Sequence, residues 1–313
     1  MNKKSSAKSA PKLWQGVFPA MTTQFRRDHS LDLEATGRHI DIMIRSGAHG
    51  IVMLGSLGEN LTLDAAEKIQ VLETAVAVAR GRVPVVSGVI ETSTLAACRH
   101  AAAAARAGAA GLMVLPAMVY RADVRETLTH YRTVARAADL PVICYNNPLA
   151  YHVDITPSMF ADLADEKRFV AIKESSGDVR RFTDLRLFVG DRFRLFCGVD
   201  DLLLEAVALG ADGWISGMNL AYPSEGQLLW ELLHDGPDSA AQALELYRWF
   251  TPLLHLDTAV KFVQYIKLAC ATRGYGTEYV RAPRLILTGS EKAAIVRLVR
   301  DAEETRPRWV KAN

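Results

Sequence analysis

The feature that most constrains the fold is a series of eight short apolar runs separated by segments with helical spacing. The runs begin near Gly16, Gly50, Val83, Gly111, Pro141, Phe169, Phe193 and Gly213. Between them, apolar residues recur at helical spacing, as from Leu33 to Ile44, before a terminating Gly47. Strands that are apolar on both faces are typical of a parallel sheet covered by helices. Eight alternations of strand and helix therefore predict a (β/α)8 TIM barrel.

A repeated tetrapeptide supports this fold class. Three runs are entered through the sequences 47–50 (GAHG), 108–111 (GAAG) and 210–213 (GADG). The first glycine suits the left-handed residue after a helix, and the second lets the chain turn into the sheet. A doubly wound open sheet is the alternative, but residues 55–59 (GSLGE) match neither GxGxxG nor a Walker lysine motif. The barrel is therefore preferred.

The barrel pattern does not account for the whole chain. Residues 14–235 contain the eight alternations, and residues 236–313 contain three further helical patterns that predict a C-terminal helical appendage packed on the barrel. Residues 1–13 are polar and lysine-rich with no apolar segment after them, so we expect a disordered tail and no signal peptide.

Composition excludes several classes of function. Half of the 313 residues are hydrophobic, 23% are charged and the formal net charge is +2, as in an ordinary soluble globular protein. No basic stripe points to a nucleic acid partner, and no apolar stretch reaches the length of about 20 residues that a membrane span needs. The cysteines and histidines lack disulfide or metal-ligand spacing, so we expect no metal and a cytoplasmic location.

The run from Phe169 contains the residue on which the functional interpretation rests. It reads FVAIKESS, and Lys173 ends a strand that is apolar on both faces, where it would share a face with Ala171 and Phe169. One interpretation is that Lys173 only marks the strand end and extends to water. The other is a desolvated amine whose pKa is lowered, so that it can act as a nucleophile on a carbonyl.

A barrel converts sequence positions into spatial neighbours, because the carboxyl ends of all strands meet on the face where TIM barrels carry their active sites. Tyr145 ends the strand next to that of Lys173, and we expect it to relay protons there. Gly55 and Ser56 follow the second strand, where converging backbone amides can hold a carboxylate. Gly217 follows the last strand and is expected to border the same site.

Three motifs in this order resemble those of the dihydrodipicolinate synthase and N-acetylneuraminate lyase superfamily. They are GSLGE at 55–59, YNNP at 145–148 and IKESSGD at 172–178, supported by GVDD at 198–201 and VRAP at 280–283. The resemblance covers about Trp14 to Arg306. It implies a Schiff base between Lys173 and C2 of a 2-oxo acid, with Tyr145 relaying protons and Ser56 and the Leu57 amide holding the substrate carboxylate.

This chain departs from the superfamily pattern at positions that bear on the substrate. The synthases carry a hydroxylated residue where this chain has Leu57, and an arginine two residues after the motif proline, where this chain has Ala150. They also carry a tyrosine after the fourth strand, from which Tyr120 is offset by several residues. Lysine biosynthesis is therefore disfavoured, and the sialic acid lyase pattern matches no better.

The residues around these departures look most like those of 1-pyrroline-4-hydroxy-2-carboxylate deaminases, which degrade hydroxyproline. This resemblance rests on residues 55–60 with Asn147 and Tyr151, which it places at the substrate. It implies that Lys173 opens a cyclic imino acid by transimination, that the 4-hydroxyl then leaves and that hydrolysis releases ammonia. No cofactor is expected, because the lysine iminium is itself the electron sink.

Two other functions stay open. One is an aldolase or dehydratase acting on a 2-oxo sugar acid with the same core residues, and the other is a barrel that binds a 2-oxo acid without turnover. The intact Lys173 and Tyr145 argue against the second. Apolar stretches at 228–230 and 249–250 predict a homotetramer or homodimer, and the resembled family is commonly tetrameric.

Overall fold

Eight parallel strands form the centre of the molecule, as described by a computed structural model of residues 14–117 and 119–310. The strands are β1 (Gly16–Pro19), β2 (Ile51–Met53), β3 (Val85–Val89), β4 (Gly111–Val114), β5 (Val142–Asn146), β6 (Phe169–Glu174), β7 (Arg194–Cys197) and β8 (Gly213–Ser216). Each begins within two residues of the start that the sequence predicts. The predicted tail at 1–13 lies outside the described residues.

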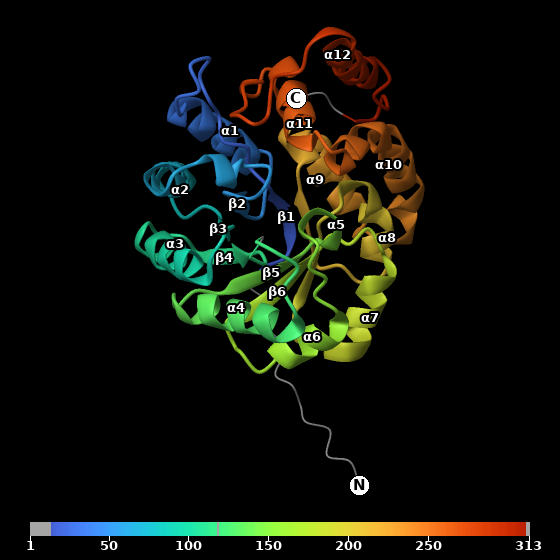
Figure 1. The fold of residues 1–313 in the computed structure, drawn as a ribbon. Helices are drawn as coiled ribbons and strands as arrows, with labels where there is room; N and C mark the ends of the chain where they lie inside the picture. The colour runs from blue at the N-terminus through green and yellow to red at the C-terminus, as the bar shows by residue number, and fades with distance from the viewer. Residues whose placement is uncertain (1–13, 118, 311–313) are drawn as a thin grey trace.

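The strands close into a barrel. Their order is β1-β8-β7-β6-β5-β4-β3-β2, and a parallel bridge between Ala20 and Val52 joins the two ends. The backbone amide of Met21 donates to the carbonyl of Val52 across this junction, at 2.8 Å. The predicted (β/α)8 TIM barrel is confirmed (Figure 1).

At least one helix follows every strand, and these helices surround the barrel (Figure 1). They are α1 (Leu33–Arg45), α2 (Ala65–Ala79), α3 (Thr94–Arg106), α4 (Val124–Arg136), α5 (Pro148–Tyr151), α6 (Pro157–Leu163), α7 (Arg180–Val189), α8 (Leu203–Ala208) and α9 (Pro223–Leu232). Capping boxes start α2 at Asp64 and α4 at Asp123, so local sequence signals fix where these helices begin.

The tetrapeptide repeat has a second physical role beyond the turn. Its first glycines adopt the left-handed conformation that the sequence predicts, with φ from 89° to 95°. Its second glycines lie against aromatic rings: a Cβ on Gly50 would be 2.1 Å from the Phe18 ring, and one on Gly213 would be 2.3 Å from the Phe196 ring. These rings pack edge to face, with 5.2 Å between their centroids. The second glycines therefore leave room for the aromatic side chains of the barrel core.

One side-chain direction differs from the prediction. The pairing of β5 with β6 shifts register at Val142, which pairs with Phe169, whereas Ile143 pairs with Ala171. The Phe169 ring packs near that of Tyr131 on α4, with 6.5 Å between the centroids. Phe169 thus faces the helical layer, and the expectation that it shares a face with Lys173 is wrong because one extra residue interrupts the alternation.

Three more helices lie together beside the barrel in Figure 1, namely α10 (Ala240–Leu254), α11 (Phe262–Thr272) and α12 (Gly289–Glu304). The Trp249 indole donates to the carbonyl of Ala302 at 3.0 Å, which joins α10 to α12. Trp230 and Phe250, two residues of the apolar stretches, are buried within the chain itself. The domain boundary after residue 235 stays a prediction.

No helix among the described residues is long and apolar enough to cross a membrane.

Candidate active site at the carboxyl ends of the strands

Lys173 and Tyr145 lie side by side at the carboxyl-terminal face of the barrel. They occupy paired positions on β6 and β5, so the strand register alone brings them together. The Lys173 Nζ atom lies 4.2 Å from the centroid of the Tyr145 ring. Both residues are buried, with 7% and 6% of their surface exposed. The interpretation that Lys173 extends to water is therefore excluded.

The surroundings of Lys173 favour a neutral amine. Among the described residues, its amine makes no hydrogen bond or ion pair, and it lies over the face of the Tyr145 ring. Burial lowers the pKa of Lys173, while the carboxylates of Asp257 and Asp200 act in the opposite direction. Gly198 on the neighbouring turn leaves space for the side chain, because a Cβ there would be 2.6 Å from Lys173 Cε. A buried amine with a lowered pKa can attack a carbonyl carbon.

Tyrosine hydroxyls connect this lysine to the turn after β2. The Tyr145 and Tyr151 rings pack edge to face at 5.7 Å, and the Tyr151 hydroxyl is hydrogen-bonded to Ser56 Oγ. Asn147 donates from Nδ2 to the Tyr145 hydroxyl at 3.3 Å and caps α5 through its other amide atom. Burial raises the pKa of both tyrosines, so their hydroxyls carry protons at neutral pH.

The 55–59 loop is held in a strained conformation. Leu54 and Glu59 flank its turn with φ near +58°, a region that costs a residue other than glycine about 1–3 kcal/mol. The Thr23 hydroxyl donates to the carbonyl of Gly58 at 2.7 Å, and Asn60 Nδ2 donates to that of Leu54 at 2.8 Å. Such strain persists only where the surroundings fix it, and it is common at ligand sites.

A buried ion pair from the C-terminal helices holds the same loop. Lys267 on α11 donates to Glu59 Oε1 at 2.9 Å and to the carbonyl of Thr23 at 2.8 Å. The second Glu59 oxygen accepts from the Arg281 amide at 3.0 Å. Both charged side chains of the pair are fully buried. The C-terminal helices therefore help to shape the loop that the sequence predicts to bind a carboxylate.

Two acidic residues at this face were missed as site residues by the sequence reasoning. Asp200, in the GVDD motif, accepts from the indole of Trp214 and the amides of Gly217 and Met218, which fixes the turn after β8. Burial raises the pKa of Asp200 to about 6. Asp257 reaches the face from the segment η5 (His255–Thr258), and no sequence pattern marked it.

The structure also shows where the remaining predicted site residues lie relative to Lys173. Gly217 follows β8 and adjoins Leu57, whose Cδ2 would lie 3.2 Å from a Cβ on Gly217. The predicted site residues thus gather on one face, and their roles stay predictions. Tyr120 is 62% exposed and donates to Glu126 Oε1 at 2.7 Å, and Ala150 is exposed. Tyr120 is therefore not a member of the cluster.

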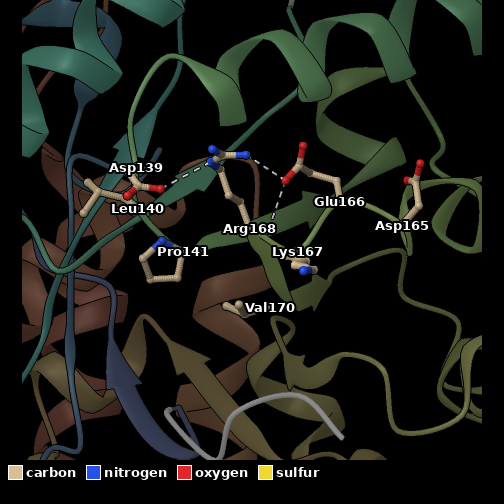
Figure 2. Close-up of a pocket in the computed structure, with 8 residues that line it drawn as sticks. All are labelled: Asp139, Leu140, Pro141, Asp165, Glu166, Lys167, Arg168 and Val170. Atoms are coloured by element: carbon tan, nitrogen blue, oxygen red, sulfur yellow. Dashed lines mark hydrogen bonds and ion pairs between the residues drawn. The ribbon is translucent and has the colours of Figure 1, made fainter. Parts of the chain in front are cut away.

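Figure 2 shows a surface hollow at the opposite end of β5 and β6. It is lined by Asp139, Leu140, Pro141, Asp165, Glu166, Lys167, Arg168 and Val170. Arg168 crosses it and pairs with Glu166 at 2.9 Å and with Asp139 at 3.7 Å. This hollow lies at the amino-terminal ends of the strands and shares no residue with the Lys173 cluster.

The described residues contain no group of three or more His, Cys, Asp or Glu side chains that could hold a metal ion. The groups that the cluster presents are an amine, tyrosine and serine hydroxyls, carboxyls and backbone amides.

Comparison with known proteins finds relatives that belong to one family. The model of the dihydrodipicolinate synthetase family matches residues 13–302. A 4-hydroxy-tetrahydrodipicolinate synthase from Salinibacter ruber is 34% identical over 273 residues, covering 87% of this chain and 89% of that protein. The same-named protein of Methanospirillum hungatei is 34% identical over 244 residues, covering 77% and 83%.

Solved structures agree with these relatives. YagE of E. coli K12, a prophage protein of the dihydrodipicolinic acid synthase family in complex with pyruvate, superposes with a TM-score of 0.88. It is 28% identical, and the match covers 93% of this chain and 99% of YagE. Dihydrodipicolinate synthase from Aquifex aeolicus also gives a TM-score of 0.88 at 28% identity, covering 93% and 98% of the two chains.

Proposed function

Since the chain belongs to the dihydrodipicolinate synthetase family, a family of lyases, we propose that it is a lysine Schiff-base aldolase or dehydratase acting on a 2-oxo acid. The observation that carries the proposal is the buried Lys173 amine over the Tyr145 ring, beside the 55–59 loop. The named relatives favour this synthase-like reading over the deaminase.

In the proposed reaction, neutral Lys173 attacks C2 and loses water to form an iminium. The hydroxyl of Ser56 and the amide of Leu57 hold the substrate carboxylate, and Tyr145 moves protons between C3, the carbinolamine oxygen and water. The iminium withdraws electrons from C3, so a C3 proton can leave and an enamine forms. The enamine then either attacks a carbonyl carbon, which forms the C3–C4 bond, or expels a leaving group from C4; aldol cleavage is the reverse of the first of these steps.

The second substrate or leaving group is proposed to differ from that of the named synthases. Ala150 is exposed and has no charge, so it offers no cation for a second carboxylate at the position where the synthases carry an arginine. Leu57 contributes an apolar side chain near Gly217 where they carry a hydroxyl. Both differences support a substrate with fewer carboxylate contacts beyond C2.

Borohydride trapping tests the Schiff base directly. Purified protein is incubated with pyruvate, reduced, digested and analysed by mass spectrometry. We expect one modified peptide, which contains Lys173, and no label on Lys167, an exposed lysine just before the same strand. Label on any other lysine would refute the assignment to Lys173. No label with pyruvate and the two 4-hydroxy substrates named below would leave a binding barrel without turnover as the better description.

A second candidate is the 1-pyrroline-4-hydroxy-2-carboxylate deaminase. The observation in its favour is Tyr151, a residue of that resemblance, which lies in the cluster and is hydrogen-bonded to Ser56. The relatives compared above give this reading no support of their own. Ammonia release from the cyclic imino acid would favour it, whereas release of pyruvate or a dehydrated product from a 2-oxo acid would favour the aldolase or dehydratase.

We also propose that the protein forms a homotetramer or homodimer in the cytoplasm. The predicted apolar stretches around Trp230 and Phe250 do not support assembly, since the chain itself buries them. Other apolar side chains do: Tyr120 is 62% exposed and Leu149 is 74% exposed near the carboxyl-terminal face. A monomer by light scattering at micromolar concentration would contradict this proposal.

A further inference from the structure

Asp257 faces the proposed reaction site from outside the barrel sequence. Its Oδ1 atom occupies the space beside Gly217, since a Cβ on that glycine would lie 2.3 Å from it. Leu57 Cδ2 and Ile266 Cδ1 border the same point, at 3.2 Å and 2.9 Å. The carboxyl group is therefore packed at the end of β8, on the side of the 55–59 loop where the Leu57 side chain lies.

Asp257 and Lys173 lie at the carboxyl ends of two different strands. One adjoins the end of β8 and the other ends β6, with β7 between them. They form no ion pair within 4.0 Å; burial lowers the pKa of Lys173, and the nearby Asp257 carboxyl group partly offsets that lowering. Both groups belong to the face on which the residues predicted to bind the substrate gather.

The charges that face Asp257 favour a protonated carboxyl group. Asp200 and Asp201 approach it from the turn after β7, and Lys173 is the nearby cation. His255, on the same segment, pairs with Asp201 at 3.5 Å. Burial, followed by the Asp200 charge, raises the pKa of Asp257 well above its usual range. A carboxyl group that holds its proton can donate it to a departing oxygen atom.

We propose that Asp257 is a further catalytic residue, which exchanges a proton with the oxygen atom on C4 of the substrate. This inference rests on the function proposed above. It specifies which atom of the substrate the C-terminal residue Asp257 contacts. The substrate class it implies is a 2-oxo acid, or its cyclic imine, with a hydroxyl on C4.

Asp257 gives up a proton in one of the two proposed reactions and takes one up in the other. In dehydration, the C3–H bond breaks, its proton leaves through Tyr145 and its electron pair forms the enamine. The enamine electrons then form the C3–C4 double bond, the C4–O bond breaks, and the Asp257 proton joins the departing hydroxide as water. In aldol cleavage, the Asp257 carboxylate takes the O4 proton, the C3–C4 electron pair forms the enamine, and C4 becomes an aldehyde.

Asp257→Asn tests the assignment, since it keeps the shape of the side chain and removes the transferable proton. Three measurements are made on this variant and on the parent: borohydride trapping of pyruvate, exchange of the pyruvate methyl protons with deuterated water, and turnover of a 4-hydroxy substrate. The probes for turnover are 4-hydroxy-2-oxopentanoate and 1-pyrroline-4-hydroxy-2-carboxylate. Asp41→Asn is the matched control, because it removes a carboxylate on α1 that pairs with Arg82 at 2.7 Å in a partly exposed ion pair.

We expect Asp257→Asn to trap pyruvate and exchange its protons within about twofold of the parent, because pyruvate has no C4. Turnover of the 4-hydroxy substrate should fall by about 10²-fold or more, the usual contribution of a positioned acid or base. The Asp41→Asn control should keep all three activities.

Two results would overturn the assignment. Unchanged turnover in Asp257→Asn would remove any role at C4, and a parallel loss of trapping and exchange would show that Asp257 serves only to maintain Lys173. A failure of the proposed function gives a different result from a failure of the Asp257 assignment. In that case the parent protein itself would trap no substrate or would turn over neither probe, and the Asp257 assignment would be refuted as well.

Discussion

Two buried lysines in this molecule have opposite surroundings. Lys267 on α11 is fully buried and makes an ion pair with Glu59 and a hydrogen bond to the carbonyl of Thr23. Lys173 on β6 is nearly as buried, yet its amine lies over the Tyr145 ring, and no carboxylate of the described residues is within ion-pair distance. Burial lowers the pKa of both amines.

The difference in the partners of the two amines distinguishes a lysine that stabilises the fold from a lysine that can react. The Lys267 amine has partners that satisfy its charge, so it can remain an ammonium that fixes the 55–59 loop. The amine of Lys173 lacks such partners, which favours the neutral form that a nucleophile requires. Burial alone therefore does not identify a reactive lysine; the partners of its amine do. Four predictions test this comparison.

The largest expected effect is on catalysis at Lys173. Lys173→Ala should abolish turnover, by about 10⁴-fold or more, together with borohydride trapping, because no other group supplies the iminium. The variant should stay folded, since alanine removes a buried polar group. Steady-state assays with circular dichroism check both parts. Retention of activity with a native spectrum would contradict the assignment, and Lys167→Ala is the control at an exposed lysine.

Lys267→Met should act mainly on stability. Removing one partner of a buried ion pair leaves Glu59 with an uncompensated charge, and such changes cost about 3–5 kcal/mol. Urea denaturation measures the free energy of unfolding. The double variant Lys267→Met with Glu59→Gln should recover most of the loss. Lys261→Met is the matched control, because it breaks the exposed pair with Glu291 and should cost about 1 kcal/mol or less.

The Tyr145 ring contacts the Lys173 amine, whereas the Tyr145 hydroxyl is proposed to transfer protons, and one variant tells these two roles apart. Tyr145→Phe keeps the aromatic face and loses the hydroxyl that Asn147 contacts. Trapping of pyruvate should persist, while turnover should fall by about 10²-fold because protons move more slowly. Rapid-quench measurement of the trapped fraction beside steady-state turnover checks this. Equal losses in both would mean that the ring position, rather than the proton, matters.

The smallest expected effect is a gain in stability. Because the folded-state pKa of Lys173 is lowered, the unfolded chain binds a proton more tightly, and the lysine destabilises the fold below its ordinary pKa. Lys173→Met should therefore raise the unfolding free energy by about 1 kcal/mol at neutral pH. The gain should fade as pH rises through 10.5, where the unfolded lysine is also neutral. Thermal unfolding at several pH values measures it, and a loss of stability at neutral pH would break the comparison.

The sequence predicted the barrel and the position of Lys173 for local reasons. Short two-sided apolar runs identify buried parallel strands, and a polar residue at the carboxyl end of such a strand must lie on the functional face. Tyr145 and Ser56 follow by the same rule. These inferences need only strand ends and alternation, which short stretches of sequence encode.

The contributions of the C-terminal segment could not be predicted in this way. Lys267 lies in a helical pattern where a lysine usually faces solvent, and only the packed fold shows that it meets Glu59. Asp257 belongs to a short turn of helix whose direction depends on how α10 and α11 pack. Phe169 shows the limit of alternation itself, since a single unpaired residue reverses a side chain.

The pairing of Glu59 with Lys267 also has a consequence for the order of biosynthesis. Ribosomes add about 5–20 residues per second, so Glu59 would emerge roughly 10 to 40 s before its partner. During that interval the Glu59 side chain, which is buried in the folded protein, has no Lys267 ammonium with which to form an ion pair. The loop around Ser56 can therefore settle only after nearly the entire polypeptide has been translated, and messages truncated before codon 267 should yield products that pyruvate does not protect from proteolysis.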